Sequence, residues 1–299
     1  MDIEGRRRSE NFEDRGRGEP GRGGGLPVQA LVSIVQMLGA KGALVVGAIA
    51  VAGYFFLPAG IKQSLFGAGE SSAPGAGASV CGASPGNKQA CDFSRVILAS
   101  TEDVWTAQFQ AGALPRYSRA PGAYINPKLA VFADAVSTGC GQATSAVGPF
   151  YCPRDGKLYI DPAFYDVMER RLRAPGDFAQ AYVIAHEVGH HVQNLIGATD
   201  LAVRGETKNQ VSVRVELQAD CFAGVWGHTA RSALAITNDD LKEAVNAAHA
   251  IGDDTLGHTN AAAYTHGTSA QRMKWFRRGF DSGDARQCDT FAVAAASAL

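Results

Sequence analysis

Residues 183–197 have the sequence VIAHEVGHHVQNLIG, which places three histidines and one glutamate within six positions. His186 and His190 are four residues apart, so on a helix they project from one face, about one turn apart. That geometry suits two imidazole nitrogens on one tetrahedral zinc ion, and Glu187 beside them would reach a zinc-bound water. His191 lies about 100° around the helix from His190, off this face. We therefore expect a helix that binds a metal ion through His186 and His190. His191 would lie on the surface or contact a metal ligand.

A catalytic zinc needs a third protein ligand. The extended pattern His-Glu-x-x-His-x-x-Gly-x-x-His is excluded, because Gln193 and Ile196 stand where it needs glycine and histidine. The downstream segment 211–226, VSVRVELQADCFAGVW, offers Glu216 and Asp220 one turn apart. Glu216 can complete a His₂Glu site, and Asp220 can accept the free N–H of a ligand imidazole. A solvated acidic face is the alternative; the apolar neighbours argue against it, because buried carboxylates need partners.

The composition limits the class of protein. The chain has 299 residues, with 28 Lys+Arg against 29 Asp+Glu and a formal charge of −1. A protein that binds nucleic acid usually has a basic stripe or a high pI, so we expect no nucleic-acid partner. Hydrophobic residues make up 46% of the chain, enough for a sizeable core in one or two folded units.

Periodicity and cap residues predict the other elements. Residues 93–110 have apolar side chains at helical spacing, whereas 122–136 and 145–161 resemble short strands. The turn residues 153–156, Pro-Arg-Asp-Gly, predict a hairpin. Helix starts are predicted at Asp161–Pro162, at Asp177, near Lys208, after Thr237 and at Thr268. The sum is a mostly helical α+β domain with a small sheet ahead of its active helices.

The N-terminal part of the chain has a different character. Residues 1–25 are rich in Gly and Arg, so we expect a disordered tail. Residues 26–61 form an apolar anchor, and its stretch 42–61 carries no charge over a length that fits one bilayer crossing. Residues 62–90 are a Gly/Ala/Ser linker, and the catalytic domain is expected over 91–299.

Basic residues predict the orientation of this anchor. Most Lys and Arg near the apolar stretch precede it, and Lys62 alone follows closely. The positive-inside rule then places the N-terminus in the cytoplasm and the catalytic domain outside it. A buried globular helix and a cleaved signal peptide are the alternatives; the long Arg-rich segment before the apolar stretch disfavours the signal peptide.

All six cysteines follow the predicted span. An oxidising compartment would favour disulfides, and the sequence alone leaves several pairings possible. Short separations favour Cys81–Cys91 and Cys140–Cys152, which leaves Cys221–Cys288. Reduced, buried cysteines are the alternative. A cysteine zinc site is disfavoured, because no Cys-x-x-Cys pair occurs.

HEVGHHVQ followed by ELQADCFAG resembles the family called putative neutral zinc metallopeptidases, bacterial membrane-anchored proteins of the gluzincin type. The similarity extends to RRRSENFEDRG, GPFYCPRDGKLYID and THGTSAQRMKWFRRGFDSGD, and so covers nearly the whole chain except the linker. The resemblance implies a zincin-like fold in a bacterial cell membrane, with Zn²⁺ held by His186, His190 and Glu216. It also implies that Glu187 is the catalytic glutamate.

These residues predict zinc-dependent cleavage of a peptide or protein substrate. Zinc lowers the pKa of its water to about 7, and Glu187 takes the proton and passes it to the leaving amine. His266, with Tyr264 behind it, is the candidate second donor to the oxyanion; a structural hydrogen bond is its alternative role. Residues 159–161 could be an edge strand that pairs with an extended peptide. Structural or exposed positions are expected for His228, His249 and His258.

Two other functions stay open. The domain could hydrolyse a non-peptide bond, such as an amide of the cell wall. It could instead be a scaffold of the cell envelope that keeps a metal for stability. Glu187 argues for chemistry, because a structural zinc site does not need a base beside its water.

Overall fold

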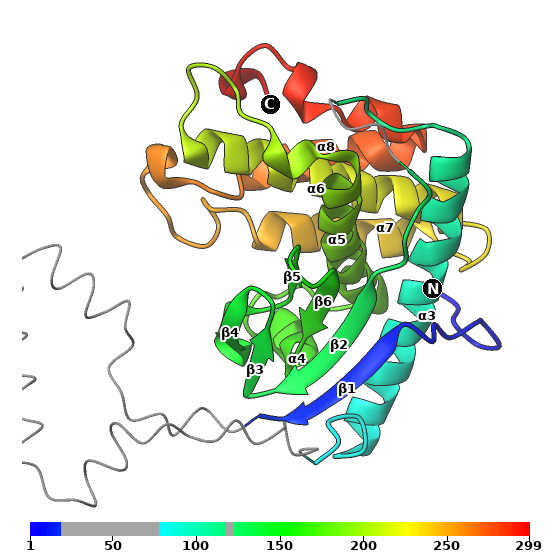
Figure 1. Cartoon of the computed structure of the whole chain (residues 1–299). Helices are drawn as coiled ribbons and strands as arrows, with labels where there is room; N and C mark the ends of the chain where they lie inside the picture. Colours follow the sequence, from blue (N-terminus) through cyan, green and yellow to red (C-terminus); the bar gives the residue numbers. More distant parts are fainter. Residues whose placement is uncertain (19–77, 118–121) are drawn as a thin grey trace, which may run out of the picture. The chain divides into compact units, whose positions relative to one another are not determined.

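The computed structural model describes residues 1–18, 78–117 and 122–299 (Figure 1). Met1–Arg17 and Ala78–Leu299 form one folded unit. Its main sheet has the strand order β1 (Phe12–Arg17), β2 (Lys128–Ala133), β6 (Lys157–Ile160) and β5 (Phe150–Cys152). The first three strands are parallel, and β5 pairs antiparallel with β6. A separate hairpin joins β3 (Ala135–Thr138) to β4 (Gly141–Thr144).

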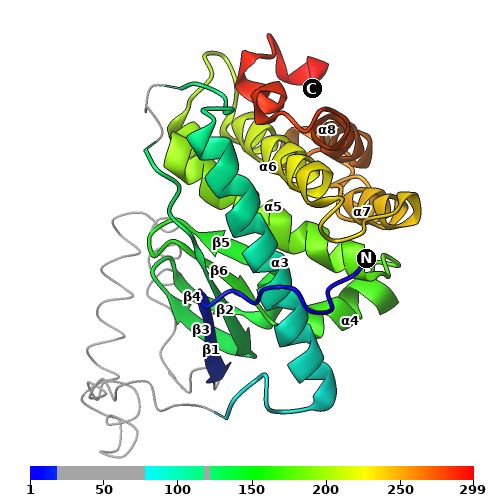
Figure 2. The same ribbon diagram turned by 90° about the vertical axis from the view of Figure 1, so that its right-hand side faces the viewer.

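The longer helices of the described residues are α3 (Pro85–Gln110), α4 (Ala163–Arg170), α5 (Asp177–Ile196), α6 (Lys208–Ala230), α7 (Asn238–Ala250) and α8 (Ser269–Ser282). Short 3₁₀ helices occupy Ser145–Val147, Ala198–Asp200, Ala261–Ala263, Ala285–Cys288, Thr290–Ala292 and Ala296–Ala298. Figure 1 shows α5 to α8 at one end of the unit and the sheet at the other, and Figure 2 shows α3 running past both. The predicted α+β class is confirmed.

The sheet order corrects one expectation. Tyr159 and Ile160 lie in β6, which pairs with β2 on one side and with β5 on the other. Residues 159–161 therefore do not form an edge strand. The edge next to the helical part is β5, which is joined to β6 by the hairpin predicted at residues 153–156.

Polar caps decide where the last three helices begin. Thr207, Thr237 and Thr268 each form a capping box with the residue three positions on, and α6, α7 and α8 start directly after them. α5 begins at Asp177 with Gly176 at the cap, so Asp177 lies in the first turn instead of capping it. Its left-handed end residue has φ 78° and is the predicted Gly197.

α5 is packed on most of its surface. Phe178 at its start stacks on Trp226 of α6, with ring centroids 5.7 Å apart. Trp105 of α3 packs edge-on against Phe222 of α6 at 5.2 Å. A helix that is apolar nearly all round belongs inside a domain, and the central part of α5 is buried accordingly. The histidine-bearing helix is therefore held from several sides.

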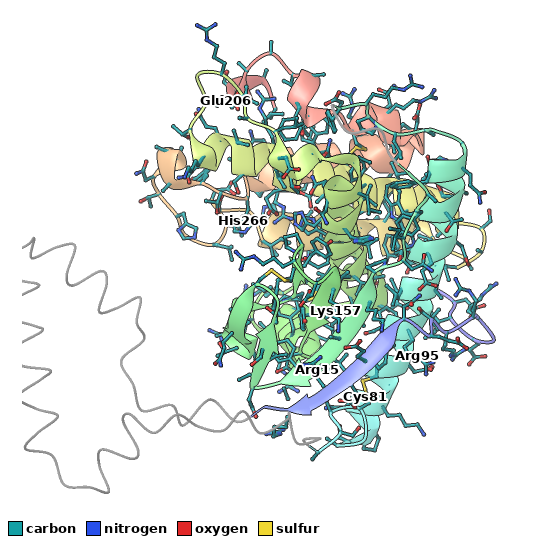
Figure 3. The ribbon with its side chains drawn as sticks, viewed as in Figure 1. Arg15, Cys81, Arg95, Lys157, Glu206 and His266 are labelled. Atoms are coloured by element: carbon teal, nitrogen blue, oxygen red, sulfur yellow. A yellow bond between two sulfur atoms is a disulfide. The ribbon has the colours of Figure 1, made fainter. Side chains whose placement is uncertain are left out.

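The first 17 residues are folded, which corrects the predicted disordered tail. Phe12 of β1 pairs with Leu129 of β2, and Arg8 forms an ion pair with Asp92 of α3 at 2.7 Å. Arg95 of α3 lies beside β1 (Figure 3). These polar and basic residues have the composition of a disordered segment, but Arg7, Arg8 and the residues of β1 have partners on α3 or in the sheet. The folded unit also starts before residue 91, because α3 begins at Pro85.

The expected transmembrane helix also needs correction. No helix among residues 1–18, 78–117 and 122–299 combines the length and apolar character that a bilayer crossing requires. The predicted span, 42–61, lies outside the described residues. The predicted fold of a domain preceded by one transmembrane helix is corrected on this finding to the α+β unit that the structure describes.

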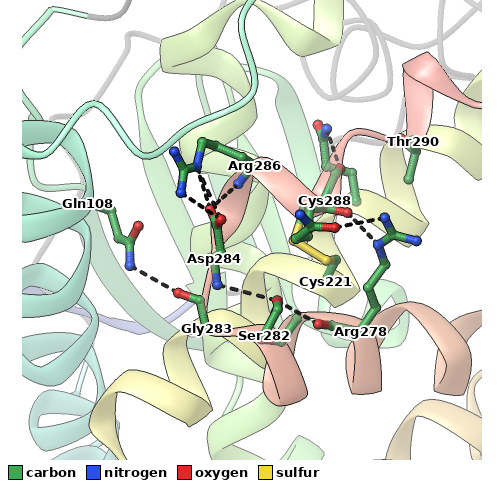
Figure 4. Close-up of a disulfide and its surroundings, with 12 residues drawn as sticks. Gln108, Cys221, Arg278, Ser282, Gly283, Asp284, Arg286, Cys288 and Thr290 are labelled. Atoms are coloured by element: carbon green, nitrogen blue, oxygen red, sulfur yellow. Dashed lines mark hydrogen bonds and ion pairs between the residues drawn. A yellow bond between two sulfur atoms is a disulfide. The ribbon is translucent and has the colours of Figure 1, made fainter.

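Three disulfides tie the unit together. They join Cys81 to Cys91, Cys140 to Cys152 and Cys221 to Cys288. These are the pairs that the sequence separations favour, and the alternative of reduced cysteines is overturned. The third disulfide links α6 to the segment after α8 (Figure 4).

Candidate metal centre

Three side chains from α5 and α6 converge on one point. One donor atom each from His186, His190 and Glu216 lies within 4.8 Å of the other two. The Nε2 atoms of His186 and His190 lie 3.2 and 3.6 Å from the Glu216 carboxylate. Two imidazoles and one carboxylate are the donor set of a catalytic zinc site. The residues therefore fit Zn²⁺, and they are the three expected from the sequence.

A glycine allows the two helices to approach each other. Gly189 lies between the two histidines, and a Cβ atom there would be 3.0 Å from the carbonyl oxygen of Ala219 in α6. Such a contact is tighter than ordinary packing, so a larger residue would push α6 away. Glu216 lies one turn before Ala219 and would move with it.

An ionic network orients His186. Its Nδ1 bonds Oδ1 of Asp220 at 2.8 Å, which is the contact expected from the sequence. Asp220 also accepts a bond of 2.5 Å from the Tyr182 hydroxyl and two bonds of 2.8 Å from Arg272 of α8. A carboxylate that is held on both oxygens fixes the ring it contacts. Nε2 of His186 is thereby left facing Glu216.

Neutral side chains orient His190. Its Nδ1 lies 2.8 Å from Oε1 of Gln193, on the same helix. Nε2 of Gln193 donates to the carbonyl of Val215 at 2.6 Å and to Oε1 of Gln218 at 3.1 Å. The amide is thus fixed at both ends. Gln193, which excludes the extended histidine motif, is the residue that orients the second histidine.

The pKa values of the two buried carboxylates favour the binding of a cation. Burial would raise the pKa of Glu216, but the two histidines hold it at about 2. Burial acts the same way on Asp220, where the Arg272 guanidinium and His186 hold the pKa well below its usual range. Burial would lower the pKa of His186, and the Asp220 and Glu216 carboxylates raise it to about 10. Both carboxylates therefore stay ionised at neutral pH, as binding of a cation requires, whereas His186 must release its extra proton when a metal binds.

A cavity of about 820 Å³ opens onto these three residues. Glu187 is buried and lines it beside His186 and His190, where a general base would be needed. Strand β5 and helix α4 contribute another part of its wall. The expected base thus shares one space with the metal donors and with the edge of the sheet.

His266 reaches the same cavity from the loop before α8. Its side chain is 48% exposed, and Nδ1 lies 3.2 Å from Oδ1 of the buried Asp253. Oδ2 of Asp253 accepts the backbone N–H groups of residues 265, 266 and 267, so one carboxylate fixes the loop and the ring together. Figure 3 shows His266 among the helices, away from Lys157 in the sheet. Tyr264 bonds the carbonyl of His258, so Asp253 is the residue that supports His266.

His191 points away from the metal donors and is buried, not a surface group. Its Nε2 donates to the carbonyl of Ile125 at 2.6 Å, and its Nδ1 accepts from the Tyr151 hydroxyl at 3.0 Å. Burial lowers the pKa of His191 to about 4, so the ring is neutral at pH 7. It connects α5 to β5. His228 bonds the carbonyl of Phe280, and His249 and His258 are exposed.

Four supporting residues are missing from the sequence prediction. Tyr182 and Gln193 lie on α5, one turn before His186 and one turn after His190, so helical spacing could have found them. Arg272 and Asp253 carry no such signal, because they lie far along the chain from the groups they contact. Only the packing of α8 and its preceding loop brings them to the site.

Comparison with known proteins agrees with this geometry. Residues 1–291 match the family model described as "Putative neutral zinc metallopeptidase". The chain is 45% identical to the uncharacterized protein YpfJ of Escherichia coli K12, over 97% of this chain and 99% of that protein. It is 44% identical to the uncharacterized proteins Mb2605 of Mycobacterium bovis and Rv2575 of Mycobacterium tuberculosis, over 58% of this chain and 65% of theirs. No solved structure matches.

The match and the donor set point the same way. A zinc metallopeptidase family implies Zn²⁺ as cofactor and, at family level, a hydrolase that acts on peptides or proteins. The chain belongs to the family of putative neutral zinc metallopeptidases.

Proposed function

We propose that this protein is a zinc-dependent metalloendopeptidase that works outside the cytoplasm. His186, His190 and Glu216 would hold the ion. The observation that carries the proposal is the position of Glu187 in the same cavity as these three donors. A site that served only to stabilise the fold would not need a base beside an open cavity.

Each residue would have a distinct role. When bound, Zn²⁺ supplies a Lewis acid that polarises the scissile carbonyl and acidifies water. Glu187 accepts a proton from the attacking water and delivers it to the leaving nitrogen. His266 would donate from Nε2 to the developing oxyanion while its Nδ1 stays next to Asp253.

The walls of the cavity favour a peptide with apolar side chains. Val147 and Leu256 are 63% and 48% exposed, and both line it. Further apolar wall residues are Phe150, Phe164, Val167, Leu172 and Val183. The edge strand β5 offers backbone groups to which an extended chain could pair. A sugar-linked amide of the cell wall would leave its hydroxyl groups against this apolar surface, so the amidase alternative is less well supported.

The three disulfides support a location outside the cytoplasm, because such bonds persist in oxidising compartments. Strand β1 pairs with β2, so residues 12–17 share the compartment of the catalytic domain. We therefore place the folded unit in the periplasm or the extracellular space.

The test uses the full chain loaded with zinc and a proteome-derived peptide library, together with peptidoglycan fragments. Glu187→Gln should retain zinc and lose activity by about 10²- to 10⁴-fold, since a general base contributes that much. Glu169→Gln, an exposed position on α4, is the matched control and should cleave normally. Wild-type rates in Glu187→Gln would eliminate the proposed base. A zinc-loaded protein that cleaves nothing, and that unfolds when zinc is stripped, would instead support the scaffold.

A further inference from the structure

Arg272 is a buried cation that the proposed chemistry does not use. Its side chain is 2% exposed, and it lies in α8, whereas the metal donors lie in α5 and α6. Nε and Nη2 donate to the two oxygens of Asp220, each at 2.8 Å. Nη1 donates to the carbonyl of Ile251 at 3.1 Å, and Nη2 also approaches the Tyr182 hydroxyl at 3.3 Å. Nη2 also lies 3.5 Å from Nδ1 of His186, so contacts with α5, α6 and the Ile251 carbonyl hold the guanidinium at the base of the site.

We propose that Arg272 is a positioning residue for zinc. It sets the plane of the Asp220 carboxylate, so that Oδ1 meets Nδ1 of His186 and Nε2 of His186 faces Glu216. This inference rests on the proposed function, because it takes His186 as a zinc ligand. It adds a residue from a third helix to the determinants of zinc affinity.

The planar fork of arginine suits this task. Two parallel N–H groups match the two oxygens of one carboxylate, whereas a lysine ammonium would act as a single point. Asp220 has no exposed side-chain surface, and its oxygens accept from His186, Tyr182 and Arg272. With both oxygens engaged, the carboxylate cannot rotate freely. The orientation of His186 then follows from the orientation of Arg272.

The packing of α8 delivers Arg272 to this position. A Cβ atom on Gly279 of α8 would lie 1.9 Å from the carbonyl oxygen of Cys221 in α6, so only glycine permits this crossing. At the start of α8, Ser269 is bonded through its backbone and hydroxyl to Asp254. After α8, the disulfide of Cys288 returns the chain to Cys221, next to Asp220 (Figure 4). The helix is thus fixed on both sides of Arg272.

A second buried arginine provides a matched control. Arg214 of α6 has no exposed side-chain surface and is paired with Glu206 at 2.5 Å. It also donates to the carbonyl of Val293, which ties the C-terminal segment to α6. It lies on the same helix as Asp220 but does not bond any metal donor in the contacts described for it. Replacing Arg214 by lysine alters a buried guanidinium without touching the ring of His186.

The experiment measures the zinc affinity of the stripped full chain by competition with a chromophoric chelator. Arg272→Gln and Arg272→Lys should bind zinc about 10- to 100-fold more weakly, as for other partners of metal ligands. Arg214→Lys should keep the wild-type affinity, although it lowers stability. In an Asp220→Asn background, Arg272→Gln should change the affinity by no more than about twofold, because the route through Asp220 is already broken.

The possible results separate the inference from the proposed function. Wild-type affinity in both folded Arg272 variants, an equal loss in Arg214→Lys, or additive losses in the double variant would each overturn the positioning role. Circular dichroism identifies a variant that fails to fold, and Arg272→Lys keeps the buried charge if Arg272→Gln is such a case. A wild-type protein that binds zinc but cleaves no peptide would refute the proposed function and leave this inference standing.

Discussion

The two histidines of the candidate metal centre are supported by different chemistry. His186 is held by the Asp220 carboxylate, which is bonded in turn to Arg272 of another helix. His190 is held by the Gln193 amide of its own helix. The first support is ionic and depends on how α8 packs, while the second is neutral and close in the sequence.

This difference predicts unequal sensitivity to change. Breaking a buried ion pair leaves an uncompensated charge, whereas breaking a neutral hydrogen bond leaves only an unpaired polar group. Substitutions in the support of His186 should therefore have larger effects than substitutions in the support of His190. The support of His186 should also respond to changes in α8 that never touch the site.

Asp220→Asn should have the largest effect on this comparison. It leaves Arg272 buried without its counter-charge, so the free energy of unfolding should fall by about 3–5 kcal/mol. Urea unfolding of the stripped protein measures this loss, with Asp239→Asn at an exposed position as control. An effect no larger than that of Gln193→Ala would show that the two supports are equivalent.

Gly279→Ala should disturb the support of His186, although Gly279 does not contact the site. Its Cβ would collide with the carbonyl of Cys221, and overpacking of this kind costs about 1–3 kcal/mol. The shift of α8 should also weaken zinc binding through Arg272. The control is Gly86→Ala in α3, where a Cβ would meet only the Ser84 side chain at 3.8 Å. Unchanged zinc affinity in a destabilised Gly279→Ala protein would separate the α8 crossing from the site.

Gln193→Ala tests the neutral hydrogen bond that supports His190. It removes the partner of His190 Nδ1, so the free energy of unfolding should fall by about 1–2 kcal/mol, the cost of an unsatisfied buried polar group. Zinc affinity should fall about tenfold, the lower end for such partners. Urea unfolding measures the first loss and competition with a chromophoric chelator measures the second, with Gln180→Ala near the other end of α5 as the control. A loss above that of Asp220→Asn would reverse the comparison.

Tyr182→Phe should have the smallest effect. Asp220 loses one donor but keeps His186 and Arg272, so the expected cost is about 1 kcal/mol with little change in zinc affinity. Tyr165→Phe, which loses a hydroxyl bonded to Ser94, is a control of equal chemistry away from the site. Zinc binding that weakens tenfold in Tyr182→Phe alone would make the hydroxyl a main support of Asp220.

Much of the fold follows from local patterns. The capping threonines before α6, α7 and α8 and the glycine after α5 mark helix ends through hydrogen bonds made within a few residues. The short strands and their hairpin are predicted in the same way. The prediction of disorder from composition was wrong for residues 1–17, because partners on α3 and in the sheet order this polar segment. Local patterns also failed for the order of the strands, which depends on long-range pairing.

Local sequence patterns were enough to identify the candidate metal donors, the candidate base and the partner of His186. His186, His190 and Glu187 follow from the periodicity of one helix, and Glu216 and Asp220 from that of another. Their supports were visible only in the folded chain: Arg272 bonded to Asp220, Asp253 bonded to His266, and the apolar wall of the cavity. The physical reason is that helical periodicity fixes which side chains share a face, while contacts between distant segments depend on how helices pack.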